Sequence, residues 1–350
     1  MTEFQSRRSP LLFPTRRTFM KGAGALAASS LAAPYVARAQ DNTLYINTWG
    51  GPWEEAARAN LFDPFTAQTG IEVRTVSPVS FAKLAQQVRT GVYEFDITTL
   101  GGGEIMRAND AGIIEEMEAP YEGGLFQNGV GSHAFATVMA WRTDKFTETP
   151  QSWADFWDVE RFPGSRSLQR YAARVLPIAL LADGVAVEDL YPLDIDRAFA
   201  SLDRIKDHIR VWWTAGAQST QILRDGEVDM IGIWHGRYFE AEDAGAPVAM
   251  TWNQGQIDRA YWVVASGTPN LENAKRFVEF ATSAEPLAGF VTQADYGALN
   301  PAANEFISQD DAQRMPTTPA NYEQCFEQDI ANFGADPAEV TERFEEWVAT

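Results

Sequence analysis

The stretch YINTWGGPWEEAARANLFDPF, residues 45–65, joins a short strand pattern directly to a helix pattern. The strand pattern ends at Trp49, Gly50 and Gly51, and the helix pattern begins immediately afterwards. Glycine lets backbone N–H groups come close to a ligand, and the face of a tryptophan ring attracts a cation. We therefore interpret this junction as one wall of a ligand cleft. The alternative is that the tryptophan packs in the core.

The same alternation continues along the chain and predicts an α/β fold with mostly parallel sheets. Strands are predicted at 43–49, 71–77, 95–100, 135–146, 209–214, 230–234 and 260–266. Helices are predicted at 54–69, 81–90, 103–112, 153–158, 194–209, 219–224, 270–283 and 337–350. Gly70 is expected to stop the first helix, and Asn270 to cap the helix that it begins.

Other glycines and tryptophans also fall at predicted strand ends: Gly101, Gly102, Trp213 and Trp234. Ligands of open α/β sheets bind in crevices at the carboxyl ends of the strands. We therefore expect these residues to line the same cleft as Trp49. Core packing is again the alternative for each tryptophan taken alone.

The first 39 residues are typical of an export signal. Residues 15–21, TRRTFMK, form a twin-arginine pattern, and an apolar run leads to Ala37-Arg38-Ala39, which fits a cleavage site. The apolar run is too short to span a bilayer. We expect export by the twin-arginine route to the periplasm and no membrane insertion after cleavage. An amphipathic N-terminal helix is the alternative.

The charge balance excludes some partners. The formal net charge is −20, and the leader holds six of the basic residues but only one acidic residue. An acidic protein lacks the basic face that nucleic acid requires, but an acidic cleft concentrates cations. Solvation of an acidic surface explains the same charge without any ligand.

Cysteine and histidine usage argues against a metal centre or another cofactor. Cys325 is the one cysteine, so no intramolecular disulfide can form, and His133, His208 and His235 are widely spaced. The chain has no phosphate loop and no G-x-S-x-G nucleophile elbow. We expect a protein that is not an enzyme.

Six segments carry a family resemblance: LYINTW, FTAQTGIEV, FDITTLGGGEIMRANDAGIIEEME, TPQSWADFWDVERFPGSR, LRDGEVDMIGIWHGR and YGALNPAA. In this order they resemble the spermidine/putrescine-binding periplasmic proteins, which are substrate-binding components of ABC importers. The resemblance implies a two-lobed type II periplasmic binding fold with two crossing strands and a ligand cleft that closes by a hinge. It implies one lobe at 40–139 and 263–303, and a second at 140–262 and 304–350. It also implies an ABC permease in the inner membrane as partner, and we expect a monomer.

The resemblance also suggests ligand contacts. The family's ligand tryptophans match Trp49 and Trp234, its small-residue loop matches Gly101 and Gly102, and its segment before the second crossing offers Asp258 or Tyr261. Two departures stand out, because His235 replaces an asparagine of the family and Ala260 replaces an acidic residue.

The identity of the amine depends on Arg174. Positions that are acidic in polyamine binders read Arg170, Tyr171 and Arg174 here. If Arg174 faces the cleft, it repels an ammonium and binds a carboxylate, so the ligand is a short zwitterion such as 4-aminobutyrate or a betaine. If it faces solvent, spermidine or putrescine binding survives through other acids.

Two further functions remain as alternatives. One is a secreted enzyme on the same fold. The other is an iron(III)-binding relative, which requires clustered tyrosines; the candidates are Tyr191, Tyr238, Tyr261 and Tyr296.

Overall fold

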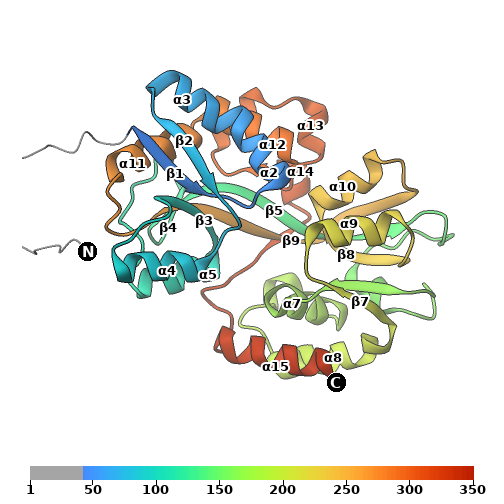
Figure 1. Cartoon of the computed structure of the whole chain (residues 1–350). Helices are drawn as coiled ribbons and strands as arrows, with labels where there is room; N and C mark the ends of the chain where they lie inside the picture. Colours follow the sequence, from blue (N-terminus) through green and yellow to red (C-terminus); the bar gives the residue numbers. More distant parts are fainter. Residues whose placement is uncertain (1–41) are drawn as a thin grey trace, which may run out of the picture. The chain divides into compact units, whose positions relative to one another are not determined.

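The computed structural model describes residues 42–350 (Figure 1). The predicted leader, with its twin-arginine pattern and cleavage site, lies outside these residues. Within the described part of the chain, no helix combines the length and the apolar character needed to cross a membrane.

One mixed sheet of 11 strands organises residues 42–350. Its main path runs in the order β2-β1-β3-β9-β5-β8-β6-β7. The strands are β1 (Thr43–Asn47), β2 (Glu72–Val76), β3 (Ile97–Gly101), β4 (Leu125–Phe126), β5 (Gly129–Arg142), β6 (Arg166–Gln169), β7 (Ile209–Trp213), β8 (Met230–Trp234), β9 (Val248–Val264), β10 (Gly297–Ala298) and β11 (Phe326–Glu327).

The expected parallel pairing holds at both ends of this path but not at its centre. β1 pairs in parallel with β2 and β3, and β6 pairs in parallel with β7 and β8. The long strands β5 and β9 pair with each other in antiparallel fashion between these two groups. Because both pass through the middle of the sheet, they connect its two ends.

β9 is much longer than the strand that the sequence predicted at 260–266. Its first part, residues 248–259, contains Asn253, Gln254 and Gly255, which are turn-forming residue types. Gln254 does adopt a left-handed conformation with φ 59°, and the pairing register with β5 shifts nearby. The strand therefore continues through an irregular segment whose residue types predict a turn, and for this reason the sequence placed the start of the strand too late.

Helices cover both groups of parallel strands, and in Figure 1 α7, α8 and α15 lie together beside β7. The α-helices are α2 (Gly51–Ala57), α3 (Asp63–Thr69), α4 (Phe81–Thr90), α5 (Gly102–Asp110), α6 (Trp153–Trp157), α7 (Ala172–Ala182), α8 (Ile195–Ile205), α9 (Gly216–Arg224), α10 (His235–Asp243), α11 (Leu271–Ala281), α12 (Ala284–Ala294), α13 (Gln309–Gln313), α14 (Pro319–Tyr322) and α15 (Pro337–Ala349). Each predicted helix has a counterpart among them.

Two helix ends can be compared with the stop and the cap that the sequence predicted. Gly70 terminates α3 in the left-handed conformation with φ 73°, which confirms the predicted stop. Asn270 stands at the N-cap of α11, but its side chain makes no capping hydrogen bond. Its Nδ2 instead donates to the buried carboxylate of Asp96, at 3.2 Å from each oxygen. Asn270 therefore stands at the predicted position, but its side chain does not cap the helix, because its amide binds the buried carboxylate of Asp96 instead.

The predicted first helix is interrupted. Residues Arg58–Phe62 form a π-helical turn, η1, between α2 and α3. Pro64 follows at the start of α3 and has no N–H to donate to the preceding turn. The local change of helix type accommodates the proline without ending the helical segment.

Buried apolar side chains form separate clusters at the two ends of the sheet. Two clusters draw their buried members from residues 44–130 and 261–315. Two others draw theirs from residues 134–257 and 326–344. In β5 the change of cluster falls between Val130 and Ala134, and in β9 it falls between Ile257 and Tyr261.

Two histidines are buried and held neutral. Burial lowers the pKa of His133 to about 3 and that of His235 to about 4. The Nδ1 atom of His235 accepts the N–H of Ala136 at 3.1 Å, which requires the neutral ring. Below pH ~6.5 the unfolded chain binds protons at these histidines while the folded chain does not, so stability falls as the pH falls toward 4.

We predict that lowering the pH from 7 to 5 reduces the free energy of unfolding by on the order of 1–2 kcal/mol for each of these histidines. His133→Leu removes one of the two contributions, so the free energy of unfolding differs less between pH 7 and pH 5 than in the wild type. His208→Gln, at an exposed position, leaves it unchanged. Urea unfolding at both pH values measures the effect, and an equal pH dependence in wild type and His133→Leu would contradict it.

Candidate ligand-binding site

The junction between β1 and α2 presents an aromatic ring at a tight turn. Trp49 is 53% exposed, and its Nε1 donates to Thr99 Oγ1 on β3 at 3.0 Å. Gly50 and Gly51 have φ values of 72° and 54°, in the left-handed region that favours glycine. Trp49 is therefore not part of the core, and its ring is available to a ligand.

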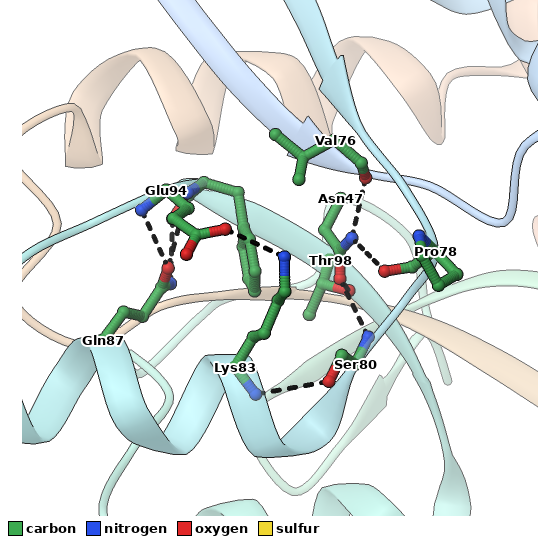
Figure 2. A network of polar contacts seen from close by, with 9 residues as sticks. Asn47, Val76, Pro78, Ser80, Lys83, Gln87, Glu94 and Thr98 are labelled. Carbon is green, nitrogen blue, oxygen red and sulfur yellow. Dashed lines mark hydrogen bonds and ion pairs between the residues drawn. The ribbon is translucent and has the colours of Figure 1, made fainter.

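A polar network fixes the strand ends beneath this turn (Figure 2). The Nδ2 atom of Asn47 donates to the carbonyl oxygens of Val76 and Pro78, at 2.7 and 2.9 Å. Its Oδ1 accepts from Ser80 N at 3.1 Å and from Thr98 Oγ1 at 3.2 Å. One buried amide thus ties together the ends of β1, β2 and β3, and so orients the turn that carries Trp49.

Gly102 lies close to another side chain of the same protein. A Cβ atom on Gly102 would lie 2.8 Å from Ile330 Cδ1, whereas one on Gly103 would lie 3.5 Å from Ile330 Cγ2. The side chain that approaches Gly102 is thus the chain's own Ile330. Gly101, one residue earlier, has open space around it.

A cavity of about 290 Å³ adjoins Gly102 and contains several predicted residues. Asp258 and Tyr261 of β9 line it together with residues 327–331, which begin at the last residue of β11. Tyr261 stacks on Phe126 with ring centroids 5.4 Å apart, and burial raises the pKa of its hydroxyl to about 12. A larger surface hollow of about 590 Å³ lies between α3, α11 and α12 and contains none of the predicted site residues.

Arg174, in the first turn of α7, points inward. Its Nε donates to Asp258 Oδ2 at 3.0 Å, and its Nη1 donates to Gln169 Oε1 at 3.0 Å. The side chains of Arg174 and Asp258 are only 13% and 8% exposed. Burial raises the pKa of the Asp258 carboxyl, and the charge and hydrogen bond of Arg174 oppose this shift. The side chain of Arg174 therefore does not face solvent, and it is not among the residues that line the cavity of about 290 Å³.

Three aromatic rings surround this guanidinium. Its Cζ lies 5.0 Å from the ring centres of Phe135 and Tyr171 and 5.4 Å from that of Trp234. We call Arg174, Asp258, Gln169, Phe135, Tyr171 and Trp234 the Arg174 cluster. The ring of Trp234, expected beside a ligand cation, lies beside the cluster's own arginine.

Trp213 does not line a cleft. It is 0% exposed, and its Nε1 donates to the carbonyl oxygen of Gly232 at 2.9 Å. Its ring meets that of Trp234 edge-on, with centroids 5.2 Å apart. The prediction of Trp213 as a wall residue is corrected here: it is a core residue that supports Trp234.

Sequence reasoning missed Phe135, Gln169 and residues 327–331. Phe135 is a single aromatic residue between alanines in β5, and that isolation was a usable signal. Residues 327–331 have no strand or helix periodicity, so nothing in their pattern placed them at the cavity.

Arg170, four residues before Arg174, pairs with Glu345 on the surface.

Metal binding finds no support in the described residues. No group of three or more His, Cys, Asp or Glu side chains in residues 42–350 could hold a metal ion. Three of the four candidate tyrosines are also separately engaged, and the buried hydroxyl of Tyr191 has no partner among residues 42–350. Tyr238 donates to Glu242 at 2.6 Å, Tyr296 packs on His133, and Tyr261 stacks on Phe126.

Comparison with known proteins gives consistent matches. The family model described as bacterial extracellular solute-binding protein matches residues 60–320. The gamma-aminobutyric acid-binding protein of Pseudomonas aeruginosa is 35% identical over 334 residues, which are 91% of this chain and 94% of that protein. The spermidine/putrescine-binding periplasmic protein of Escherichia coli is 26% identical over 322 residues, 82% of this chain and 85% of that one.

A solved structure supports the same assignment. The ABC transporter substrate-binding protein from Bradyrhizobium japonicum matches with a TM-score of 0.82 and 34% identity, over 87% of this chain and 98% of that one. The resemblance drawn from the six sequence segments, and the two-lobed α/β fold that it implied, are thereby confirmed.

Proposed function

Since the chain belongs to the bacterial extracellular solute-binding proteins and serves as the substrate-binding component of an ABC transporter, we propose that its ligand is a short zwitterionic amino acid of the 4-aminobutyrate class. The observation that carries this proposal is the inward, nearly buried Arg174 paired with Asp258. The partner that receives the ligand is an ABC permease of the inner membrane.

The Arg174–Asp258 pair leaves one nitrogen and one oxygen without a partner. Within residues 42–350, Arg174 Nη2 and Asp258 Oδ1 have no hydrogen-bond partner. A guanidinium N–H suits a carboxylate, and a carboxylate oxygen suits an ammonium. The two charged groups of a zwitterion match these two atoms. The exposed ring of Trp49 offers a further surface for the ammonium group, at ~0.5–2 kcal/mol for such a contact.

A long polyamine fits this site less well. Three acidic residues line the cavity, but Asp258 is paired with Arg174 and Glu327 with Arg259. Asp329 is the one lining acid without an ion pair in the described chain. An ammonium 4 Å from an arginine costs roughly 4 kcal/mol at an effective dielectric near 20, which is about a thousandfold in affinity. Pairing with Asp258 reduces that cost but leaves few free carboxylates for a polycation.

We propose binding without catalysis. The chain does contain a serine–histidine contact, Ser132 Oγ to His133 Nδ1 at 3.0 Å. Both residues are buried, at 0% and 3% exposure, and the pKa of His133 is lowered to about 3 by burial. A substrate has no access to such a pair, and the histidine is too weak a base at neutral pH. This supports a transport role over a secreted enzyme.

The lobe boundaries and oligomeric state are also part of the proposal. We propose one lobe at 40–139 and 263–303, a second at 140–262 and 304–350, and a monomer. The change of hydrophobic cluster within β5 and within β9 supports two lobes joined by these strands, and it falls between residues 130 and 134 and between 257 and 261, a few residues before the proposed boundaries.

Arg174→Gln is predicted to weaken 4-aminobutyrate binding by about 10- to 100-fold, because one charge-assisted contact to the carboxylate is lost. Isothermal titration calorimetry with 4-aminobutyrate, putrescine and spermidine provides the measurement. Arg170→Gln is the matched control, since it removes a surface arginine four residues away. Spermidine binding that is tighter than 4-aminobutyrate binding, and that survives Arg174→Glu, would refute the zwitterion while leaving the transporter assignment intact.

We further propose export to the periplasm, which the family supports, by the twin-arginine route, which the pattern in residues 15–21 supports. Replacing Arg16 and Arg17 by lysine is predicted to leave uncleaved precursor in the cytoplasm. Replacing Arg7 and Arg8 by lysine is the control, because those arginines lie outside the pattern. Cell fractionation followed by immunoblotting measures both, and normal export of the Arg16/Arg17 variant would exclude this route.

A further inference from the structure

Three buried polar atoms without partners lie on adjacent strands next to the Arg174 cluster. They are Thr137 Oγ1 on β5, Trp234 Nε1 at the end of β8 and Gln256 Oε1 on β9. None of the three has a hydrogen-bond partner among residues 42–350. Thr137 is 2% exposed and Gln256 is 0% exposed, so solvent does not reach their side chains freely.

The strand register places these residues together. Thr137 lies directly opposite Trp234 in the β5–β8 pair and directly opposite Gln256 in the β5–β9 pair. Residues opposite each other in antiparallel strands point to the same face of the sheet. The three side chains therefore form one patch, with Thr137 in the middle. We call it the Thr137 niche.

The Thr137 niche adjoins the Arg174 cluster at several points. Trp234 belongs to both groups. Thr137 follows Phe135 by two residues in β5, and Gln256 precedes Asp258 by two in β9, so each shares a face with a member of the cluster. The Nε2 atom of Gln256 donates to the carbonyl oxygen of Ala173, which immediately precedes Arg174, at 3.2 Å. The niche is thus contiguous with the site proposed for the ligand.

Three unpartnered atoms in one patch are costly. Leaving one buried donor or acceptor unpaired costs about 1–3 kcal/mol, and native proteins pair nearly all such groups. Asn47, in the same sheet, shows the satisfied alternative, because its buried side chain has four partners. Seven other buried polar atoms of residues 42–350 also lack partners, but no three of them lie opposite one another in paired strands as those of Thr137, Trp234 and Gln256 do.

The hydrogen-bonding capacity of the three side chains determines which chemical group can bind in the Thr137 niche. The indole Nε1 can only donate, the amide Oε1 can only accept, and the threonine hydroxyl can do either. An ammonium cannot accept from Trp234, and a carboxylate cannot donate to Gln256. A single O–H group can do both, and can use Thr137 as well.

We propose that the Thr137 niche is a hydroxyl subsite of the ligand-binding site, and that the preferred ligand is a short amino acid carrying a hydroxyl on the carbon chain between its charged ends. This rests on the proposed zwitterion function and narrows its substrate class. An ordered water offers the same O–H chemistry, so the test separates a ligand hydroxyl from a water.

The test compares 4-aminobutyrate with each enantiomer of 4-amino-3-hydroxybutyrate by calorimetry. In the wild type one enantiomer binds about tenfold more tightly than 4-aminobutyrate, the increment of one well-formed hydrogen bond. Thr137→Val, which keeps the side-chain shape, reduces this preference to twofold or less and changes 4-aminobutyrate affinity by less than twofold.

Thr282→Val is the matched control. Thr282 is also 0% exposed, but its hydroxyl donates to the carbonyl oxygen of Val278 at 2.7 Å, in α11. This variant keeps the tenfold preference and melts at a lower temperature, because it loses a satisfied hydrogen bond. Thr137→Val melts at an equal or higher temperature, because it removes an unpartnered hydroxyl.

Two results would overturn the hydroxyl subsite. One is equal affinity of the wild type for 4-aminobutyrate and both hydroxylated enantiomers. The other is an equal loss of affinity for all three ligands in Thr137→Val, which indicates a water in the niche. Both leave the dependence of 4-aminobutyrate binding on Arg174 intact, so failure of this inference is distinct from failure of the proposed function.

Discussion

The ion pair between Arg174 and Asp258 is the interaction on which the proposed binding site depends. It joins the first turn of α7 to β9, one of the two strands that run through the middle of the sheet. Removing one partner of such a buried pair typically costs about 3–5 kcal/mol, because the other charge is left without compensation. Pairing also sets the charge of the site. A buried arginine alone would repel an amine and a buried aspartate alone would attract one, whereas the pair presents both signs to a ligand that carries both.

Separate parts of the structure hold this pair and the ring of Trp49 in place. Phe135, Tyr171 and Trp234 flank the guanidinium, and Trp213 supports Trp234 from the core. Asn47 ties the ends of three strands beneath the turn that carries Trp49. The acidic member of the pair thus lies on the long central strand β9 and the arginine lies on α7, whereas the exposed ring of Trp49 follows a strand of the neighbouring parallel group. The antiparallel strands β5 and β9 connect the two.

Local patterns allowed much of this fold to be predicted. Strand and helix periodicities located the elements, and Gly70 marked a helix end, because these features depend on residues close in the chain. The pattern could not separate Trp49, whose ring is exposed, from Trp213, which is core, since both stand at the predicted end of a strand. The direction of the Arg174 side chain could not be predicted either, because its partner Asp258 lies 84 residues away in the chain. Residues 327–331 reach the cavity through tertiary packing and have no periodicity that reveals it.

A crystal structure with bound 4-aminobutyrate would show whether Arg174 holds the ligand carboxylate. We expect one carboxylate oxygen about 2.7–2.9 Å from Arg174 Nη2, with the Arg174–Asp258 pair intact and the ammonium group beside Asp258 Oδ1 or the ring of Trp49. A bound ligand whose carboxylate makes no contact with Arg174 would show that this arginine does not select the ligand.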